Sequence, residues 1–249
     1  MSNKPIFAVI TAYYKEPLEV IQRAISSVKN MDPSSFEIRH YLIADGYPQA
    51  ELLNTHKFHF TLNQSHSDFG DTPRLVGSMI AIREGATGLM FLDADNIVYS
   101  NHLKLCCEKY INDESNIILT KRDWLHINGS QLNFKSEEDE NYSHVDTGCF
   151  TFFDEAIFEI FKWALIPKEL SGFGDRYFWN LLRSSRKNFG ATGLPTVGYT
   201  CTWRDVYEKL GLEIPDDVPD QKLDMDFQRK FFDGLSNQKR IEIRNRLKL

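Results

Sequence analysis

The feature that most constrains the fold is a short apolar run, Leu89 to Leu92, that ends in the two acids Asp93 and Asp95. Four consecutive large apolar residues are typical of a strand buried on both faces, and acids inside such a strand would lack a counter-charge. The two acids therefore belong at the carboxyl end of the strand. Open α/β sheets bind their ligands at that edge, and two acids on one turn suit Mg²⁺ or Mn²⁺ together with substrate phosphates.

The sequence before this run alternates between strand and helix patterns. Apolar runs predict strands at residues 6–10, 38–44 and 58–62, and apolar spacing predicts helices from Pro17 and from Thr72 to Glu84. Such alternation predicts an α/β fold with a mixed, mostly parallel central sheet flanked by helices. Its ligand crevice lies at the carboxyl ends of the strands, where Tyr13, Asp45 and Asp93 all fall.

The pattern changes after about residue 115. We expect a hairpin around Asn128-Gly129, an acidic loop at residues 136–141 and a strand at residues 145–153. Helices are expected at residues 155–164 and 175–183. The chain shows no internal repeat and no low-complexity linker, so we expect one main domain over residues 1–222, divided at about 115/116, and a C-terminal basic helix over residues 223–249.

Composition excludes several classes of protein. The 249 residues are 42% hydrophobic, which is enough for a full core, and the net charge of -6 argues against a nucleic-acid partner. The cysteines form no CxxC pair and two are adjacent, so we expect reduced thiols in the cytoplasm; they are Cys106, Cys107, Cys149 and Cys201. We find neither a signal core nor a membrane-spanning run.

Charge is unevenly distributed near the C-terminus. Residues 205–226 hold eight acids and two lysines, whereas residues 228–249 hold seven Lys or Arg and two acids. We expect the basic helix to pack on the acidic segment before it, and a peripheral contact with the inner face of the membrane is the alternative. Its buried stripe would comprise Phe231, Phe232, Leu235, Ile241, Ile243 and Leu247. The sequence assigns no oligomeric state.

Several motifs follow one another in a familiar order. They are the run at residues 10–14 with Glu16 behind it, the turn at residues 44–47, the glycine-containing segment at residues 70–74, and Asp93-Ala94-Asp95. In this order the chain resembles the family 2 glycosyltransferases, which have the nucleotide-sugar-binding GT-A fold. The resemblance covers roughly residues 5–205.

The resemblance implies a donor site and a divalent cation, Mn²⁺ or Mg²⁺. Asp95 would bind the ion, with Asp93 reaching the ion or the ribose. The donor would be a nucleoside diphosphate sugar, UDP-linked, and the acceptor a glycan or glycolipid, as in hexosyltransferases of polysaccharide biosynthesis. The residues that the resemblance assigns to nucleotide-sugar binding are Thr11, Ala12, Tyr13, Glu16, Asp45, Arg74, Asp93, Ala94 and Asp95.

A catalytic base is also implied, at the start of a helix. Asp175 in the run at residues 172–179 matches the family's base, with Gly174 where many members carry Glu. Asp175 would take a proton from the acceptor hydroxyl in a single displacement that inverts the anomeric centre. Some relatives use a late His near the metal, but residues 198–203 contain none.

Simpler structural interpretations exist for the same residues. Asp93 and Asp95 can form a solvated turn, Asp45 can be a turn residue before Gly46, and Asp175 can be an acid favoured by a helix N-terminus. Arg74 can be a solvated cation at a helix start.

Two other functions are compatible with the sequence. An apolar strand ending in Asp-x-Asp also begins the site of haloacid dehalogenase-type phosphohydrolases, where the first acid is the nucleophile. A non-catalytic sugar-nucleotide-binding protein would keep the fold without the base.

Overall fold

The computed structural model describes residues 4–185, 187–219 and 226–249. These residues form one sheet of eight strands in the order β3-β2-β1-β4-β7-β6-β8-β5. The strands are β1 (Ile6–Tyr13), β2 (Glu37–Ala44), β3 (His59–Thr61), β4 (Ala86–Phe91), β5 (Ile97–Val98), β6 (Ile117–Leu125), β7 (Phe150–Phe153) and β8 (Phe189–Thr200).

The sheet has two parallel parts joined by an antiparallel strand. β1 is parallel to both β2 and β4, β3 is parallel to β2, and β6 is parallel to β8. β7 runs antiparallel to both β4 and β6 and joins the two parts, and β5 is antiparallel to β8. The prediction of a mixed, mostly parallel sheet is confirmed.

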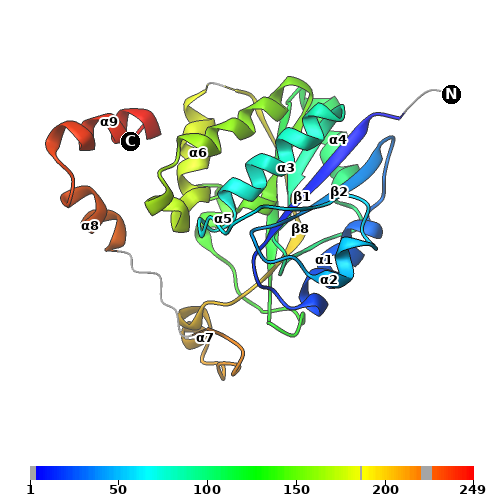
Figure 1. The fold of residues 1–249 in the computed structure, drawn as a ribbon, viewed down its shortest axis with the longest axis horizontal. Helices are drawn as coiled ribbons and strands as arrows, with labels where there is room; N and C mark the ends of the chain where they lie inside the picture. The colour runs from blue at the N-terminus through cyan, green and yellow to red at the C-terminus, as the bar shows by residue number, and fades with distance from the viewer. Residues whose placement is uncertain (1–3, 186, 220–225) are drawn as a thin grey trace.

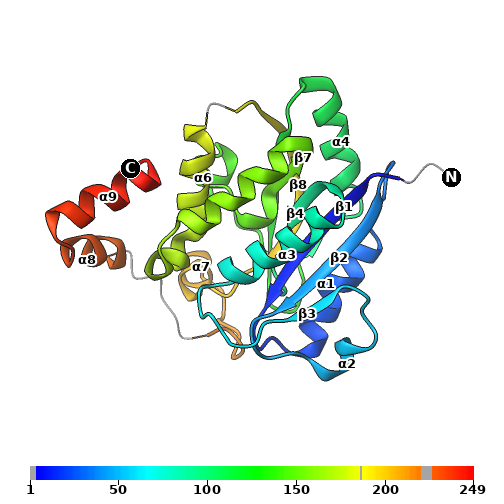
Figure 2. The ribbon, with the colours of Figure 1, turned by 45° about the horizontal axis from the view of Figure 1, so that its top comes forward.

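Helices cover both faces of the sheet (Figures 1 and 2). The α-helices are α1 (Leu18–Lys29), α2 (Ala50–Leu53), α3 (Asp71–Arg83), α4 (His102–Asp113), α5 (Glu137–Glu140), α6 (Gly174–Ser184), α7 (Arg204–Leu210), α8 (Phe227–Asp233) and α9 (Asn237–Leu247). The 3₁₀ segments are η1 (Thr147–Cys149), η2 (Asp154–Leu165) and η3 (Lys168–Phe173).

Side chains of β4 alternate between the two helical layers. Leu89 and Phe91 join the core under α3, η2 and α6, whereas Met90 and Leu92 join the core under α1 and α4. All four are at most 1% exposed. The predicted strand buried on both faces is therefore confirmed, and the acids follow it immediately.

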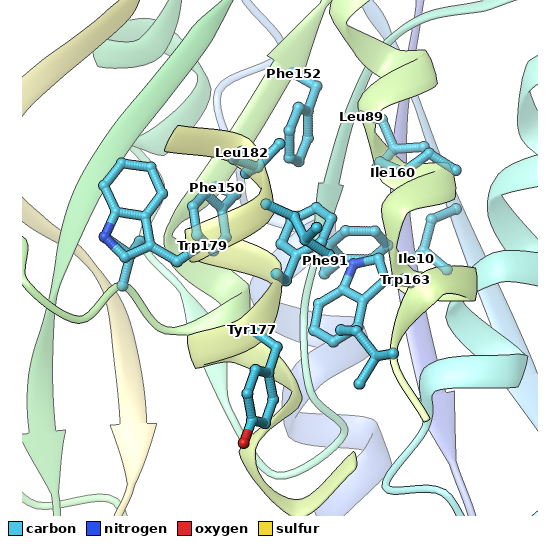
Figure 3. Close-up of a cluster of buried hydrophobic side chains, with 14 of the residues drawn as sticks. Ile10, Leu89, Phe91, Phe150, Phe152, Ile160, Trp163, Tyr177, Trp179 and Leu182 are labelled. Carbon is cyan, nitrogen blue, oxygen red and sulfur yellow. The ribbon is translucent and has the colours of Figure 1, made fainter. Parts of the chain in front are cut away.

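An aromatic cluster fixes α6 against the sheet (Figure 3). The ring of Trp163 in η2 stacks on Phe178 of α6 at 4.4 Å and meets the edge of Phe91 at 6.2 Å. Phe150 of β7 contacts Phe178 from the sheet. Rigid packing of these rings sets the position of the first turn of α6, which carries Asp175.

Three predictions for the second half need correction. The strand expected at residues 145–153 begins at Phe150, because the Asp146 carboxylate accepts the Gly148 N–H (3.0 Å) and starts a 3₁₀ turn. The helix expected at residues 155–164 is the 3₁₀ segment η2. The hairpin at Asn128-Gly129 is a turn closed by a single bridge outside the main strands.

The C-terminal tail was predicted as one helix, and this is wrong. It forms α8 and α9, because the Ser236 hydroxyl accepts the Lys239 N–H and starts a second helix. α9 packs on α6, with Ile243 and Leu247 buried and Ile241 61% exposed, so Ile241 does not join the predicted stripe. The boundary expected at 222/223 lies outside the described residues.

No helix in the described ranges combines the length and the apolar character needed to cross a membrane.

The close contact of β4 with β1 predicts a large effect of one added methyl group. A Cβ at Gly88 would lie 2.5 Å from Phe7 Cδ2, inside a buried core. We expect Gly88→Ala to lower the free energy of unfolding by about 1–3 kcal/mol. Urea unfolding measures this change, and Gly172→Ala, whose Cβ would meet Phe69 at an ordinary 3.6 Å, is the control. Equal stability of the two variants would contradict the prediction.

Candidate active site

The acidic turn after β4 is held from three sides. The Asn96 N–H bonds to the Asp93 carbonyl (3.1 Å), and the Asn96 side chain accepts the backbone N–H of Thr200 (2.9 Å). The Arg23 guanidinium of α1 donates to the Asp95 carbonyl (3.4 Å). The late segment around Thr200 thus contributes backbone support to the acidic turn.

A cavity of about 560 Å³ opens at the carboxyl ends of β1, β2 and β4. This is the crevice that the strand pattern predicted. All predicted donor-site residues except Thr11 line it. Its lining comprises Ala12, Tyr13, Tyr14, Glu16, Asp45, Ser67, Phe69, Gly70, Pro73, Arg74, Asp93, Ala94 and Asp95.

Thr11 was predicted to bind the donor, and its side chain is misplaced for that role. It is fully buried, and its hydroxyl is 2.9 Å from His40 Nε2. Alternation along β1 sends Thr11 to the opposite face from Ala12, where β2 supplies a polar partner. The prediction is wrong for this side chain.

Asp45 lines the cavity, but its carboxylate is already hydrogen-bonded. It accepts the N–H of His66 (3.0 Å) and of Ser67 (3.3 Å), the hydroxyl of Ser65 (3.2 Å), and it lies 2.9 Å from His66 Nδ1. These bonds anchor the loop that forms one wall of the cavity. The turn interpretation of Asp45 therefore explains its contacts in full.

Arg74 points its guanidinium at the acidic turn. Its Nη2 lies 2.5 Å from Asp93 Oδ1, and its Nη1 donates to the Phe69 carbonyl (2.9 Å) and lies 3.5 Å from Asp71 Oδ1. Arg74 is 8% exposed, so it is a fixed cation beside the cavity and not a solvated helix-start residue. An arginine held in this way suits a diphosphate.

Asp95 lies in surroundings that disfavour its negative charge. Burial, together with the charges of Asp93 and Glu16, raises the pKa of Asp95 to about 7. No basic side chain among the described residues forms an ion pair with Asp95. The same described ranges contain no group of three or more His, Cys, Asp or Glu side chains arranged to hold a metal. The carboxylates of Asp93 and Asp95 are ligands of the kind that Mg²⁺ and Mn²⁺ take together with phosphates and water.

Asp175 lies in a second cavity, of about 270 Å³. It stands in the first turn of α6, where its Oδ1 accepts the Arg176 N–H (2.7 Å) and its Oδ2 lies 2.6 Å from His144 Nε2. Its side chain is 25% exposed. Aromatic side chains line much of this cavity, among them Trp124, Phe134, Phe173, Tyr199 and Trp203.

Steric crowding explains why a glycine precedes Asp175. A Cβ at Gly174 would lie 2.8 Å from the Trp163 ring and 3.3 Å from Asp71 Oδ1. The Glu found here in many family 2 members therefore cannot fit without moving Trp163. Asp71 of α3 places a carboxylate in the adjoining space, and burial raises the pKa of Asp71 to about 7.

The acidic segment at residues 136–141, which contains α5, forms ion pairs with β6 and α6 that the sequence analysis did not predict. Glu138 pairs with Arg176 (2.6 Å), Asp139 with Arg122 (3.0 Å), and Glu140 with Lys121 (2.5 Å). Each of the last three acids of α5 thus meets a different cation from β6 or α6.

Arg122 is the centre of a buried ion-pair network. Its Nη1 lies 2.7 Å from Asp146 Oδ2, and its guanidinium carbon lies 4.4 Å from the ring centroids of both Trp124 and Tyr199, two rings that also contact each other. Asp139 also accepts the indole N–H of Trp124 (3.1 Å). The sequence contained one sign of this network: Arg122 lies within a mostly apolar strand, where a buried cation needs acidic partners.

His144 and Asp175 form a charged pair. Burial lowers the pKa of His144, but hydrogen bonds to Asp139 and Asp175 outweigh it and raise that pKa to about 9. Burial raises the pKa of Asp175, but the His144 hydrogen bond and charge reverse the effect and hold it below its usual value. At neutral pH the pair is therefore an imidazolium and a carboxylate.

The two cavities are close to each other. Burial raises the pKa of Asp146 and Arg122 lowers it, and the charges of Asp93, in the first cavity, and Asp175, in the second, both raise it further. A Cβ at Gly172, in the second cavity, would lie 3.6 Å from the ring of Phe69, in the first.

No family model matches the sequence, and no curated protein matches it. Solved structures do match. The chain is similar to S. aureus TarS 1-349, with 15% identity and a TM-score of 0.61 over 97% of this chain and 70% of that one. For the same protein in complex with UDP-GlcNAc the identity is 13% and the TM-score 0.64, over 95% and 70% of the two chains. GalNAc-T7 with UDP, GalNAc and Mn²⁺ matches with 15% identity and a TM-score of 0.60, over 81% and 45%.

These likenesses show the fold. The chain has the GT-A fold of glycosyltransferases, as the motif order predicted.

Proposed function

We propose that this chain is a metal-dependent, inverting glycosyltransferase. It would transfer a sugar from a nucleoside diphosphate sugar, UDP-linked, to a hydroxyl of a glycan or glycolipid. The observation that carries the proposal is the pair of neighbouring cavities, one lined by Arg74 and the acidic turn and the other by the Asp175 carboxylate. A reaction between a diphosphate donor and a hydroxyl acceptor needs such a pair of sites. The solved structures with UDP, UDP-GlcNAc and Mn²⁺ support this choice.

Arg74, Asp93 and Asp95 would bind the donor diphosphate. Arg74 is already fixed by Phe69, Asp71 and Asp93, so its cation needs no reorganisation when charge develops on the leaving group. Asp95, with Asp93, would hold Mn²⁺ or Mg²⁺, which when bound supplies charge that stabilises the departing diphosphate.

Asp175 would act as the general base. The acceptor oxygen forms a bond to the anomeric carbon while the bond from that carbon to the diphosphate oxygen breaks, and the electron pair leaves with the nucleoside diphosphate. The hydroxyl proton passes to Asp175, which is ionised at neutral pH. Attack opposite the leaving group in one step inverts the anomeric centre.

The aromatic wall of the second cavity favours a sugar acceptor. Trp203 and Phe134 line this cavity, and their rings would pack on the apolar face of a pyranose. The placement of the enzyme in the cytoplasm, and contact of α8 and α9 with the inner face of a membrane, are further parts of the proposal that rest on composition and charge.

Donor-dependent release of nucleoside diphosphate tests the function. The protein is incubated with Mn²⁺, Mg²⁺ or EDTA and a panel of UDP-, GDP- and dTDP-sugars. We expect release of nucleoside diphosphate from one donor class, faster with Mn²⁺ or Mg²⁺ than with EDTA. Phosphate release from simple monoesters, without release from any donor, would instead support the phosphohydrolase. Nucleotide binding without release from any donor would support a non-catalytic binding protein.

A further inference from the structure

A buried histidine stands directly behind Asp175. His144 is 6% exposed, its Nε2 lies 2.6 Å from Asp175 Oδ2, and its Nδ1 lies 3.5 Å from Asp139 Oδ1. Both ring nitrogens therefore face carboxylate oxygens. A neutral imidazole has one N–H and one lone pair, and the lone pair would face an anion. The geometry by itself thus favours an imidazolium.

Asp139 in turn is held in place by β6. It accepts hydrogen bonds from Arg122 Nε (3.0 Å) and Trp124 Nε1 (3.1 Å). The imidazole plane is consequently fixed from its far side by residues of a central strand. Because His144 has no freedom to turn, the direction of its second N–H fixes where Asp175 Oδ2 lies.

We propose that His144 is a positioning residue for Asp175: its imidazolium orients the carboxylate toward the second cavity and keeps it ionised. The inference rests on the proposed role of Asp175 as base. His144 itself would not exchange a proton with substrate, because both its nitrogens are occupied by carboxylates.

The other cations near His144 and Asp175 do not orient the Asp175 carboxylate. Arg122 is bound to Asp139 and Asp146, and the Arg176 guanidinium is bound to Glu138. Among the described residues, His144 is the one cationic side chain in hydrogen-bond contact with the Asp175 carboxylate. The charged groups that surround His144 and Asp175 are Arg122, Glu138, Asp139, Asp146, Arg176 and, from α3, Asp71.

A pH profile separates positioning from general support of the fold. Without the imidazolium, only the charge of Arg122 and the Arg176 N–H oppose the effect of burial on the pKa of Asp175. We expect His144→Gln to move the acid limb of the kcat/KM profile for nucleoside diphosphate release upward by about one pH unit or more. The control is His126→Gln, which removes another ring, one that packs near Tyr207 and does not line the second cavity. An unchanged acid limb in His144→Gln would overturn the proposal, since a purely structural role lowers the rate equally at all pH values.

Nuclear magnetic resonance of the histidine rings tests the pairing without any substrate. In the wild-type protein we expect the His144 ring to stay protonated at both nitrogens to about pH 9. In Asp175→Asn its pKa should fall by at least about one unit, because a carboxylate has gone. Titration of His144 near its ordinary value in the wild type would overturn the inference even in an active enzyme. Absence of donor turnover together with the expected His144 titration would instead overturn the proposed function.

Discussion

Asp175→Asn is expected to lower the rate of sugar transfer about 10²–10⁴-fold, the range that general-base catalysis contributes. Asn has nearly the same shape; its Oδ1 can still accept the Arg176 N–H, and its Nδ2 can donate to a neutral His144 ring, so the first turn of α6 should keep its structure. It cannot take a proton. Nucleotide affinity, measured by calorimetry with Mn²⁺ present, should change little, because Asp175 does not line the donor cavity.

The same substitution at Asp205 is the matched control. Asp205 also lines the second cavity, but its side chain is 51% exposed and pairs only loosely with Lys209 at 3.5 Å. Asp205→Asn should leave the transfer rate within a few-fold of wild type. A transfer rate near wild type in Asp175→Asn would show that another group is the base.

Asp95→Ala should abolish the assistance that Mn²⁺ gives to nucleotide binding. The loss in metal-dependent affinity is expected to be at least about tenfold, and the loss in transfer about 10²-fold or more, because an ion at this turn supplies several kcal/mol of charge stabilisation. Calorimetry with UDP, with and without Mn²⁺, measures the first effect. Undiminished Mn²⁺-assisted affinity in the variant would remove the basis of the metal site.

Stability separates this effect from damage to the fold. Asp95 has a raised pKa because the native structure disfavours its charge, so removing the carboxylate costs the metal-free protein little. We expect metal-free Asp95→Ala to unfold at the same temperature as wild type or higher at neutral pH. Asp113→Ala, in α4 and paired with Lys109 on the surface, is the control and should retain Mn²⁺-assisted binding.

The first cavity was predictable because its signals are local. Each strand shows as an apolar run, and the first polar residue after the run marks the edge of the sheet where ligands bind. Asp45, Asp93 and Asp95 were placed in this way, whereas Arg74 was named through the resemblance of residues 70–74. The error at Thr11 is equally informative, because the resemblance named a run of residues and not the face of β1 that each occupies.

The surroundings of Asp175 were less accessible to sequence reasoning. No metal-like spacing to another histidine marks His144, and the acids of residues 136–141 were expected to form a loop. Their partners, Arg122 and Asp175, are far away in the chain. Nothing in local spacing connects these residues, which meet where α5, β6 and the first turn of α6 come together.

The sequence by itself determined the strands of the first half, the edge at which the first cavity opens, and the acids that follow β4. These properties depend on apolar periodicity and on turn residues, which act between neighbours in the chain. Only the tertiary structure decided that Thr11 faces His40, that a side chain at position 174 would clash with Trp163, and that His144 lies in hydrogen-bond contact with Asp175. Such pairings depend on which strands become neighbours, and strand order is set by packing of the whole core rather than by any one segment.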